Sequence, residues 1–179
     1  MWNGKRYHSF DFDCRERFGK KLYKLSLNAG FTCPNRDGTL GTRGCIFCSA
    51  GGSGDFAASS KLTITEQIGQ ARQLVAAKNP SVQYIAYFQA YTNTYAPLPV
   101  LERVFFEAAS HPDIAALSIA TRPDCLGREV LSLLKRLSEI KPVTVELGLQ
   151  TIHENSAAFV RRGYPLNVYE EAVWALDSA

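Results

Sequence analysis

The chain contains 179 residues, of which 46% are hydrophobic and 21% are charged. This length and composition indicate one globular domain and exclude disorder over most of the chain. No apolar stretch reaches the roughly 18 residues that a membrane span requires. No apolar core follows the first basic residues either, so we expect no secretory signal and a cytoplasmic location.

The net charge of +3 is unevenly distributed along the chain. Residues 1–50 carry nine basic and four acidic side chains, a net of +5, whereas the other 129 residues carry eleven and thirteen, a net of −2. Residues 1–23, which we treat as a basic N-terminal extension, interleave these charges with aromatic side chains, and that composition suits contact with RNA. The alternatives are a solvated basic face and an apolar plug over the rest of the fold.

The first predicted strand leads into a long loop. Residues 24–28 alternate apolar and polar side chains, which is typical of a strand. The loop that follows, over residues 29–56, is rich in Gly, Asn, Asp and Cys. It is about twice as long as an ordinary connection, and loops of that length in a compact domain usually carry function.

Helices and strands alternate after this loop. Thr63 and Glu66 form a capping-box pattern that begins a helix, and Asn79-Pro80 ends it. The later elements are predicted in this order: strand 82–88, helix 99–110, strand 115–120, helix 127–140, strand 143–149 and helix 167–177.

This order repeats a strand–helix unit four times, which predicts an α/β fold with a parallel sheet and right-handed crossovers. We therefore expect the site at the carboxyl ends of the strands, in the long loop and in segments 89–95, 121–125 and 150–154. Four units do not close a barrel, and no stop signal ends the last helix. We therefore expect this chain to be either the N-terminal part of a longer protein or a short relative of one. Its open sheet edges would favour association with other chains.

Cysteines are the most informative residue type. An odd count of five argues against a disulfide framework. Cys33, Cys45 and Cys48 fall within 16 residues, and thiolates hold zinc or iron–sulfur clusters. A structural zinc site needs a fourth ligand, for which Cys125 is a candidate. Three cysteines alone would instead hold three irons of a [4Fe–4S] cluster and leave the fourth iron open.

Longer motifs surround these cysteines. They are KLSLNAGFTCPNRDGT at 24–39, GCIFC at 44–48, GSGDF at 52–56, YFQAYTNTYA at 87–96, TRPDC at 121–125 and ELGLQ at 146–150. Together they closely resemble the radical S-adenosylmethionine (SAM) enzymes, and more narrowly the YtqA/YhcC-type proteins, relatives of the elongator catalytic subunit. Twelve positions separate the first two cysteines, where most radical SAM enzymes have four, and this longer loop is a feature of that subfamily.

The resemblance implies a fold, cofactors and a reaction. The fold is a partial (β/α)6 barrel, of which residues 24–179 supply about four units. A [4Fe–4S] cluster would be held by Cys33, Cys45 and Cys48, with SAM on the open iron. Reduction by an external electron donor, such as flavodoxin or ferredoxin, would cleave SAM to a 5′-deoxyadenosyl radical that abstracts hydrogen from the substrate. Elongator relatives act on transfer RNA at the wobble uridine, so tRNA is the expected substrate, with Arg161 and Arg162 as further phosphate contacts.

The resemblance also implies contacts to SAM in the long loop and in segment 89–95. Phe47 stands where the family places an aromatic side chain against the adenine; the alternative is a loop aromatic that fills a core gap. Gln89 and Thr92 follow the second strand, where the family contacts the methionine amino group. The glycine-glycine-glutamate form of that motif is absent here, and turn capping is the alternative role for both residues.

Further SAM contacts are implied after the third and fourth strands. Thr121 and Asp124 follow the third strand, although Asp124 is also a candidate helix N-cap. Glu146 lies within an apolar strand and must find a partner, either a donor on SAM or Arg122. Gln150 at the strand end can reach a ligand.

Two other readings of the sequence stay open. The same cysteines and basic segment would serve a zinc-stabilised RNA-binding module without catalysis, although such a module would not need the strand–helix repeats. The chain is alternatively an inactive fragment, because the family fold uses six units and we count four.

Overall fold

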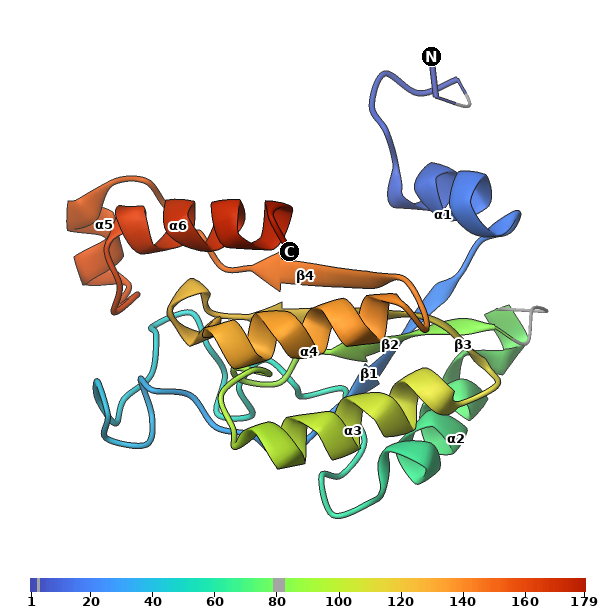
Figure 1. The fold of residues 1–179 in the computed structure, drawn as a ribbon, viewed down its shortest axis with the longest axis horizontal. Helices are drawn as coiled ribbons and strands as arrows, with labels where there is room; N and C mark the ends of the chain where they lie inside the picture. The colour runs from blue at the N-terminus through green and yellow to red at the C-terminus, as the bar shows by residue number, and fades with distance from the viewer. Residues whose placement is uncertain (3, 79–82) are drawn as a thin grey trace.

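The computed structural model describes residues 1–2, 4–78 and 83–179. Within them the chain forms these helices and strands, with two short 3₁₀ turns (Figure 1): α1 Phe10–Phe18, β1 Tyr23–Leu27, α2 Ile64–Val75, η1 Ala76–Lys78, β2 Tyr84–Phe88, α3 Leu98–Ser110, β3 Ile114–Thr121, η2 Pro123–Cys125, α4 Arg128–Ser138, β4 Val143–Leu147, α5 Glu154–Phe159 and α6 Leu166–Asp177.

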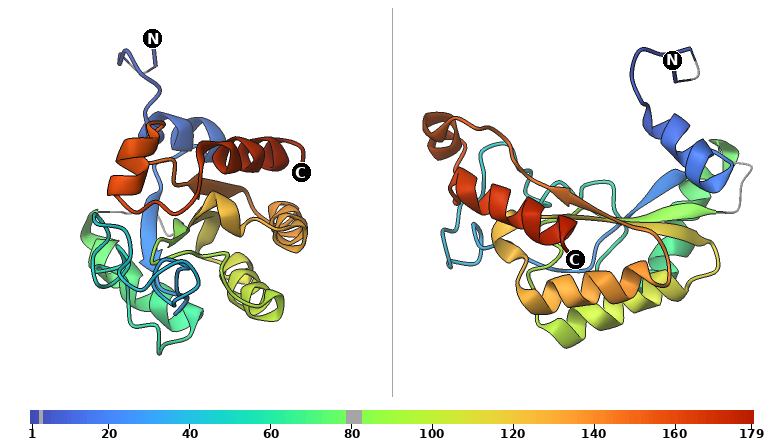
Figure 2. Two further views of the ribbon diagram at one scale, coloured as in Figure 1. Left: turned by 90° about the vertical axis from the view of Figure 1, so that its left-hand side faces the viewer. Right: turned by 45° about the horizontal axis from the view of Figure 1, so that its top comes forward.

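The four strands form one parallel sheet in the order β1-β2-β3-β4. Helices α2, α3 and α4 cover one face of this sheet (Figures 1 and 2). The predicted α/β fold with four strand–helix units is confirmed, and it matches part of a barrel. The predicted strand at 82–88 is found at Tyr84–Phe88, while Val82 and the stop at Asn79-Pro80 lie outside the described residues.

The capping box at the start of α2 is present as predicted. The Thr63 side chain accepts a hydrogen bond from the Glu66 amide at 3.2 Å, and the Glu66 carboxylate accepts one from the Thr63 amide at 2.8 Å. Two helices, α1 and α5, were not predicted. Within the part of the chain that the structure describes, no helix is long and apolar enough to cross a membrane.

The main core lies between the sheet and α2–α4. Alternate strand residues such as Leu27, Phe88 and Ile119 are fully buried against these helices. Phe105 of α3 lies at the centre, with its ring centroid 5.0 Å from that of Phe88 and 6.5 Å from that of Phe31, both edge-on. This layer fixes the sheet on which the long loop is mounted.

Helix α1 covers the amino-terminal end of the other sheet face. Ser9 accepts from the Phe12 amide at 3.3 Å to begin the helix, and Gly19 ends it at φ 71°. Cys14 is buried in a second, small apolar cluster with Ile85 and Ala116 of the sheet. Part of the N-terminal extension therefore packs over the sheet through Cys14 and Phe18, whereas the aromatic side chains of Tyr7 and Phe10 are exposed.

Phe105→Ala should lower the free energy of unfolding by about 3–5 kcal/mol, because it empties a fully buried site between two other rings. Urea unfolding followed by circular dichroism measures this loss. Phe56→Ala is the matched control, since that ring is 91% exposed, and its effect should stay within about 0.5 kcal/mol. Equal losses in the two variants would contradict this assignment of the core.

Candidate functional site

A cavity of about 320 Å³ lies at the carboxyl ends of the strands, where the sequence predicted a site. Cys33, Cys45 and Cys48 all line it, although they are up to 15 positions apart in the chain. Six of the seven residues expected to contact a cofactor also line it: Phe47, Gln89, Thr92, Thr121, Glu146 and Gln150. The fold therefore brings the long loop and the segments after β2, β3 and β4 around one space.

Two side chains that line the cavity are available to contact a ligand. Phe47 is 53% exposed, so the alternative that it fills a core gap is wrong. Thr92 is 1% exposed, yet its hydroxyl oxygen has no hydrogen-bond partner among the described residues. Because a buried hydroxyl without a partner costs free energy, Thr92 is suited to a group that enters the cavity.

Asp124 lies away from this cavity. Its carboxylate accepts two hydrogen bonds from the Arg122 guanidinium, at 2.7 and 2.9 Å, and it lines a separate hollow together with Cys125. The predicted helix-capping role for Asp124 is wrong, because Gly127 is the N-cap of α4 and no side chain caps that helix. The chain folds Asp124 back on Arg122, two residues earlier.

Glu146 takes partners other than the expected Arg122. Its carboxylate accepts hydrogen bonds from Lys24 of β1, Ser118 of β3 and, at 3.2 Å, the hydroxyl of Tyr87 of β2. Burial acts to raise the pKa of Glu146, but the bonds from Lys24 and Ser118 hold it below its ordinary value. Burial also raises the pKa of Tyr87 to about 12, so Tyr87 stays protonated and its hydroxyl donates a hydrogen bond to Glu146.

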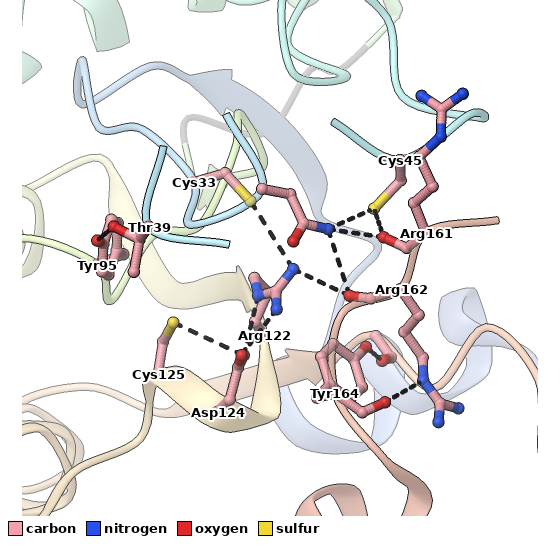
Figure 3. A network of polar contacts seen from close by, with 12 residues as sticks. Cys33, Thr39, Cys45, Tyr95, Arg122, Asp124, Cys125, Arg161, Arg162 and Tyr164 are labelled. Atoms are coloured by element: carbon pink, nitrogen blue, oxygen red, sulfur yellow. Dashed lines mark hydrogen bonds and ion pairs between the residues drawn. The ribbon is translucent and has the colours of Figure 1, made fainter. Parts of the chain in front are cut away.

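The cysteine loop is held in place by segment 161–164 (Figure 3). The Asn35 side-chain amide donates to the Cys45 sulfur at 3.2 Å and to the Arg161 carbonyl at 2.8 Å. The Arg122 guanidinium donates to the Arg162 carbonyl at 3.1 Å and lies 4.0 Å from the Cys33 sulfur. Each of these two polar side chains therefore joins a cysteine to a segment more than a hundred residues later.

Arg162 is a structural residue and not the phosphate contact that we expected. It is 1% exposed, and its guanidinium donates to the Thr151 carbonyl at 2.6 Å, the Tyr164 carbonyl at 2.8 Å and the Glu154 carboxylate at 3.2 Å. A side chain so enclosed cannot reach a nucleic acid. Arg161 is exposed, and its role as a phosphate contact stays a prediction.

The other two cysteines lie elsewhere. Cys14 belongs to α1 and is buried where this helix packs on the amino end of the sheet. Burial raises the pKa of Cys125 to about 12, and its thiol lies 3.8 Å from the Asp124 carboxylate, outside the cavity lined by Cys33, Cys45 and Cys48. Neither cysteine lines the cavity that the first three share, so a four-thiolate zinc site finds no support here.

The three thiols around the cavity are the donor type that both zinc and iron–sulfur clusters take. Among the described residues, no group of three or more His, Cys, Asp or Glu side chains is placed to hold one metal ion. The thiol donor set, with the unpartnered Thr92 hydroxyl on the same cavity, fits an iron–sulfur cluster with a small molecule beside it.

Comparison with known sequences decides the family. The sequence model of the radical SAM superfamily matches residues 36–179. This chain belongs to the radical SAM superfamily. YtqA of Bacillus subtilis (strain 168) is 46% identical over 169 residues, YhcC of Escherichia coli (strain K12) 40% over 167, and MJ0486 of Methanocaldococcus jannaschii 30% over 173.

These alignments cover 93–95% of this radical SAM chain but only 52–53% of each relative. The chain thus spans about half the length of the curated relatives that it matches. YtqA and MJ0486 are both described as uncharacterized, so their names do not indicate a substrate.

The sequence analysis assigned no role to several residues that shape this radical SAM site. Tyr91, for example, joins the segment after β2 to the cysteine loop. Its amide donates to the carbonyl of Gly52 in the GSGDF motif, and its hydroxyl donates to the carbonyl of Ala50 just before that motif, both at 2.9 Å. Asn35 and Arg36 lie in a quoted motif, and Arg36 bonds the Cys48 carbonyl at 3.2 Å. Membership of a motif was the available signal for these residues, but their partners depend on the fold.

Gly52→Ala should lower the free energy of unfolding by about 2–5 kcal/mol, through backbone strain and overpacking. Gly52 has φ 63°, and an added Cβ would lie 2.4 Å from the Tyr91 ring. Gly38→Ala is the matched control, because Gly38 has φ 96° but nothing within 4 Å of an added Cβ. Urea unfolding compares the two variants, and a loss no larger than that of Gly38→Ala would show that the Tyr91 contact is unimportant.

Proposed function

We propose that this chain forms the cofactor-binding core of a radical SAM enzyme. The observation that carries the proposal is the convergence of Cys33, Cys45 and Cys48 on one cavity at the carboxyl ends of a parallel sheet. These three thiolates would hold a [4Fe–4S] cluster. When bound, the cluster and SAM supply the one-electron chemistry that generates a 5′-deoxyadenosyl radical.

The residues around the thiolates would bind and orient these groups. The Asn35 amide and the Arg122 guanidinium point at the sulfurs of Cys45 and Cys33, where they would stabilise negative charge. Burial raises the pKa of the Cys45 thiol, so such partners matter for its ionisation. In this proposal the protein positions the cofactor, and the cofactor supplies the reactive chemistry.

SAM would occupy the rest of the cavity. Phe47 offers an exposed ring for the adenine, and Thr92 offers a buried hydroxyl that lacks a partner. Gln89, Thr121 and Gln150 line the same wall, and the Thr121 hydroxyl is fixed at 2.6 Å from that of Thr94. Glu146 also faces this space, but it already accepts three hydrogen bonds, so a contact to SAM would have to use its remaining acceptor capacity.

The substrate and the electron donor belong to the same proposal. We retain tRNA as the substrate, on the basis of the basic residues near the N-terminus and the resemblance to elongator. We retain a protein such as flavodoxin or ferredoxin as the reductant. The location in the cytoplasm and association through the sheet edges at β1 and β4 also stay predictions.

Replacing Cys33, Cys45 or Cys48 with Ala should abolish cluster assembly. The test is anaerobic reconstitution, followed by iron analysis and low-temperature electron paramagnetic resonance (EPR) of the dithionite-reduced protein with and without SAM. A [4Fe–4S]⁺ signal that changes when SAM is added would support an open iron. Cys14→Ala and Cys125→Ala are the controls, and both should keep the cluster.

Other outcomes would overturn the proposal in distinct ways. A cluster signal indifferent to SAM would indicate an incomplete SAM pocket. Loss of metal in Cys125→Ala as well, or a zinc content of one per chain without iron, would favour the zinc-stabilised module.

Asn35→Ala should weaken retention of the cluster about 10- to 100-fold, as removal of outer-shell partners does at other metal sites. Its amide contacts the Cys45 sulfur and also holds segment 161–164. Iron release to a chelator measures the effect, and urea unfolding of the metal-free chain separates it from general loss of stability. Unchanged iron release would contradict the role given to this contact.

A further inference from the structure

Exposed apolar side chains lie on the cysteine loop and at the end of α5. Leu40 is 54% exposed, Ile46 46% and Phe159 74%. The Ile46 amide donates to the Val160 carbonyl at 3.3 Å, which holds the loop against the end of α5. These residues, with Arg43 and Arg161, form what we call the outer loop surface.

A hollow of about 510 Å³ lies within the outer loop surface, between residues 40–44 and α5. Arg43 and Arg161 line it, both are exposed, and neither forms an ion pair with another described residue. The acidic residue at this hollow, Glu154, is bonded to the buried Arg162 at 3.2 Å. The free charge at the hollow is therefore positive.

This hollow lies directly behind one of the three thiols. Asn35 lines the hollow and also donates to the Cys45 sulfur at 3.2 Å. The Cys45 thiol in turn lies 3.3 Å from the Arg161 carbonyl, and the Arg161 guanidinium points away from it toward the outside (Figure 3). One layer of side chains thus separates the hollow from Cys45.

We propose that the outer loop surface docks an acidic protein that delivers single electrons to the group held by Cys45. Exposed apolar side chains flanked by arginines are typical of protein interfaces. Unpaired guanidinium groups select carboxylates, so the partner's contact face carries Asp and Glu. The short path through Asn35 to the sulfur favours a redox partner over other acidic proteins, because electron transfer slows steeply with distance.

The inference rests on the proposed function, since the electron has to reach a cluster. In the step itself no bond is made or broken. The donor protein loses one electron, and the cluster charge falls from 2+ to 1+.

The experiment compares two reductants on the reconstituted chain. Reduced flavodoxin tests docking, and photoreduced 5-deazaflavin, a small neutral reductant, shows whether the cluster can be reduced at all. In the double variant Arg43→Glu/Arg161→Glu, the rate with flavodoxin should fall at least about tenfold at low salt, while the rate with deazaflavin stays unchanged. Lys20→Glu/Lys21→Glu is the matched control, because it changes the net charge equally at a half-buried and an exposed position near β1, away from Cys45.

A binding measurement on the metal-free chain separates the two proposals. Titration of flavodoxin should give a dissociation constant that rises at least about tenfold in the arginine variant and with Phe159→Ser, but not in the lysine control. Binding of this kind without cluster assembly would refute the proposed function and leave the docking surface standing.

Three results would overturn the docking surface itself. One is equal reduction by flavodoxin in the arginine variant and the parent chain. Another is reduction by deazaflavin with neither binding nor reduction by flavodoxin. The third is a dimer, seen by light scattering, that Phe159→Ser dissociates without any change in flavodoxin reduction, since the surface would then join two copies of the chain.

Discussion

The site depends on a buried connection between the cysteine loop and the segment that follows α5. Arg162 is almost fully enclosed, and burying a guanidinium is costly unless its donors are satisfied. Backbone carbonyls of residues 151 and 164 and the Glu154 carboxylate accept from it. Because these acceptors come from the turns around α5, the arginine fixes that segment as a rigid wall for the loop.

Asn35 and Arg122 connect the segment after α5 to the cysteine thiols. Gly163 allows the approach: it has φ 83°, and a Cβ there would lie 2.6 Å from the Asn35 side-chain oxygen. The Tyr164 ring lies between two guanidinium groups, 4.9 Å from that of Arg122 and 5.0 Å from that of Arg162. Two guanidinium groups thus lie behind the cysteines, each paired with a carboxylate, that of Asp124 or Glu154, and each held in place by backbone carbonyls and the Tyr164 ring.

Much of this arrangement was predictable, and the errors have physical causes. Alternating strands, the capping box at Thr63 and the spacing of the cysteines are local signals, and each gave a correct element or a shared cavity. Helix α1 had local signals too, Ser9 and Gly19 at its ends, but the segment was interpreted by its charge. Arg162 was misassigned because burial depends on residues far away in the chain, which composition does not show. Asp124 lies outside the cavity because it bends back on Arg122.

The two faces of the sheet differ in composition and in role. One face is apolar and packs on α2–α4, whereas the other presents Lys24, Tyr87, Ser118 and Glu146, one residue from each strand. A filled barrel would place branched apolar side chains on that inner face. Here the Lys24–Glu146 charge pair is neutral overall and bonded across all four strands, so it can border the cavity without leaving an unpaired charge. The same bonds link β1 to β4, the two edge strands of the sheet, and so hold its curvature from the inside while the inner face stays open to a ligand.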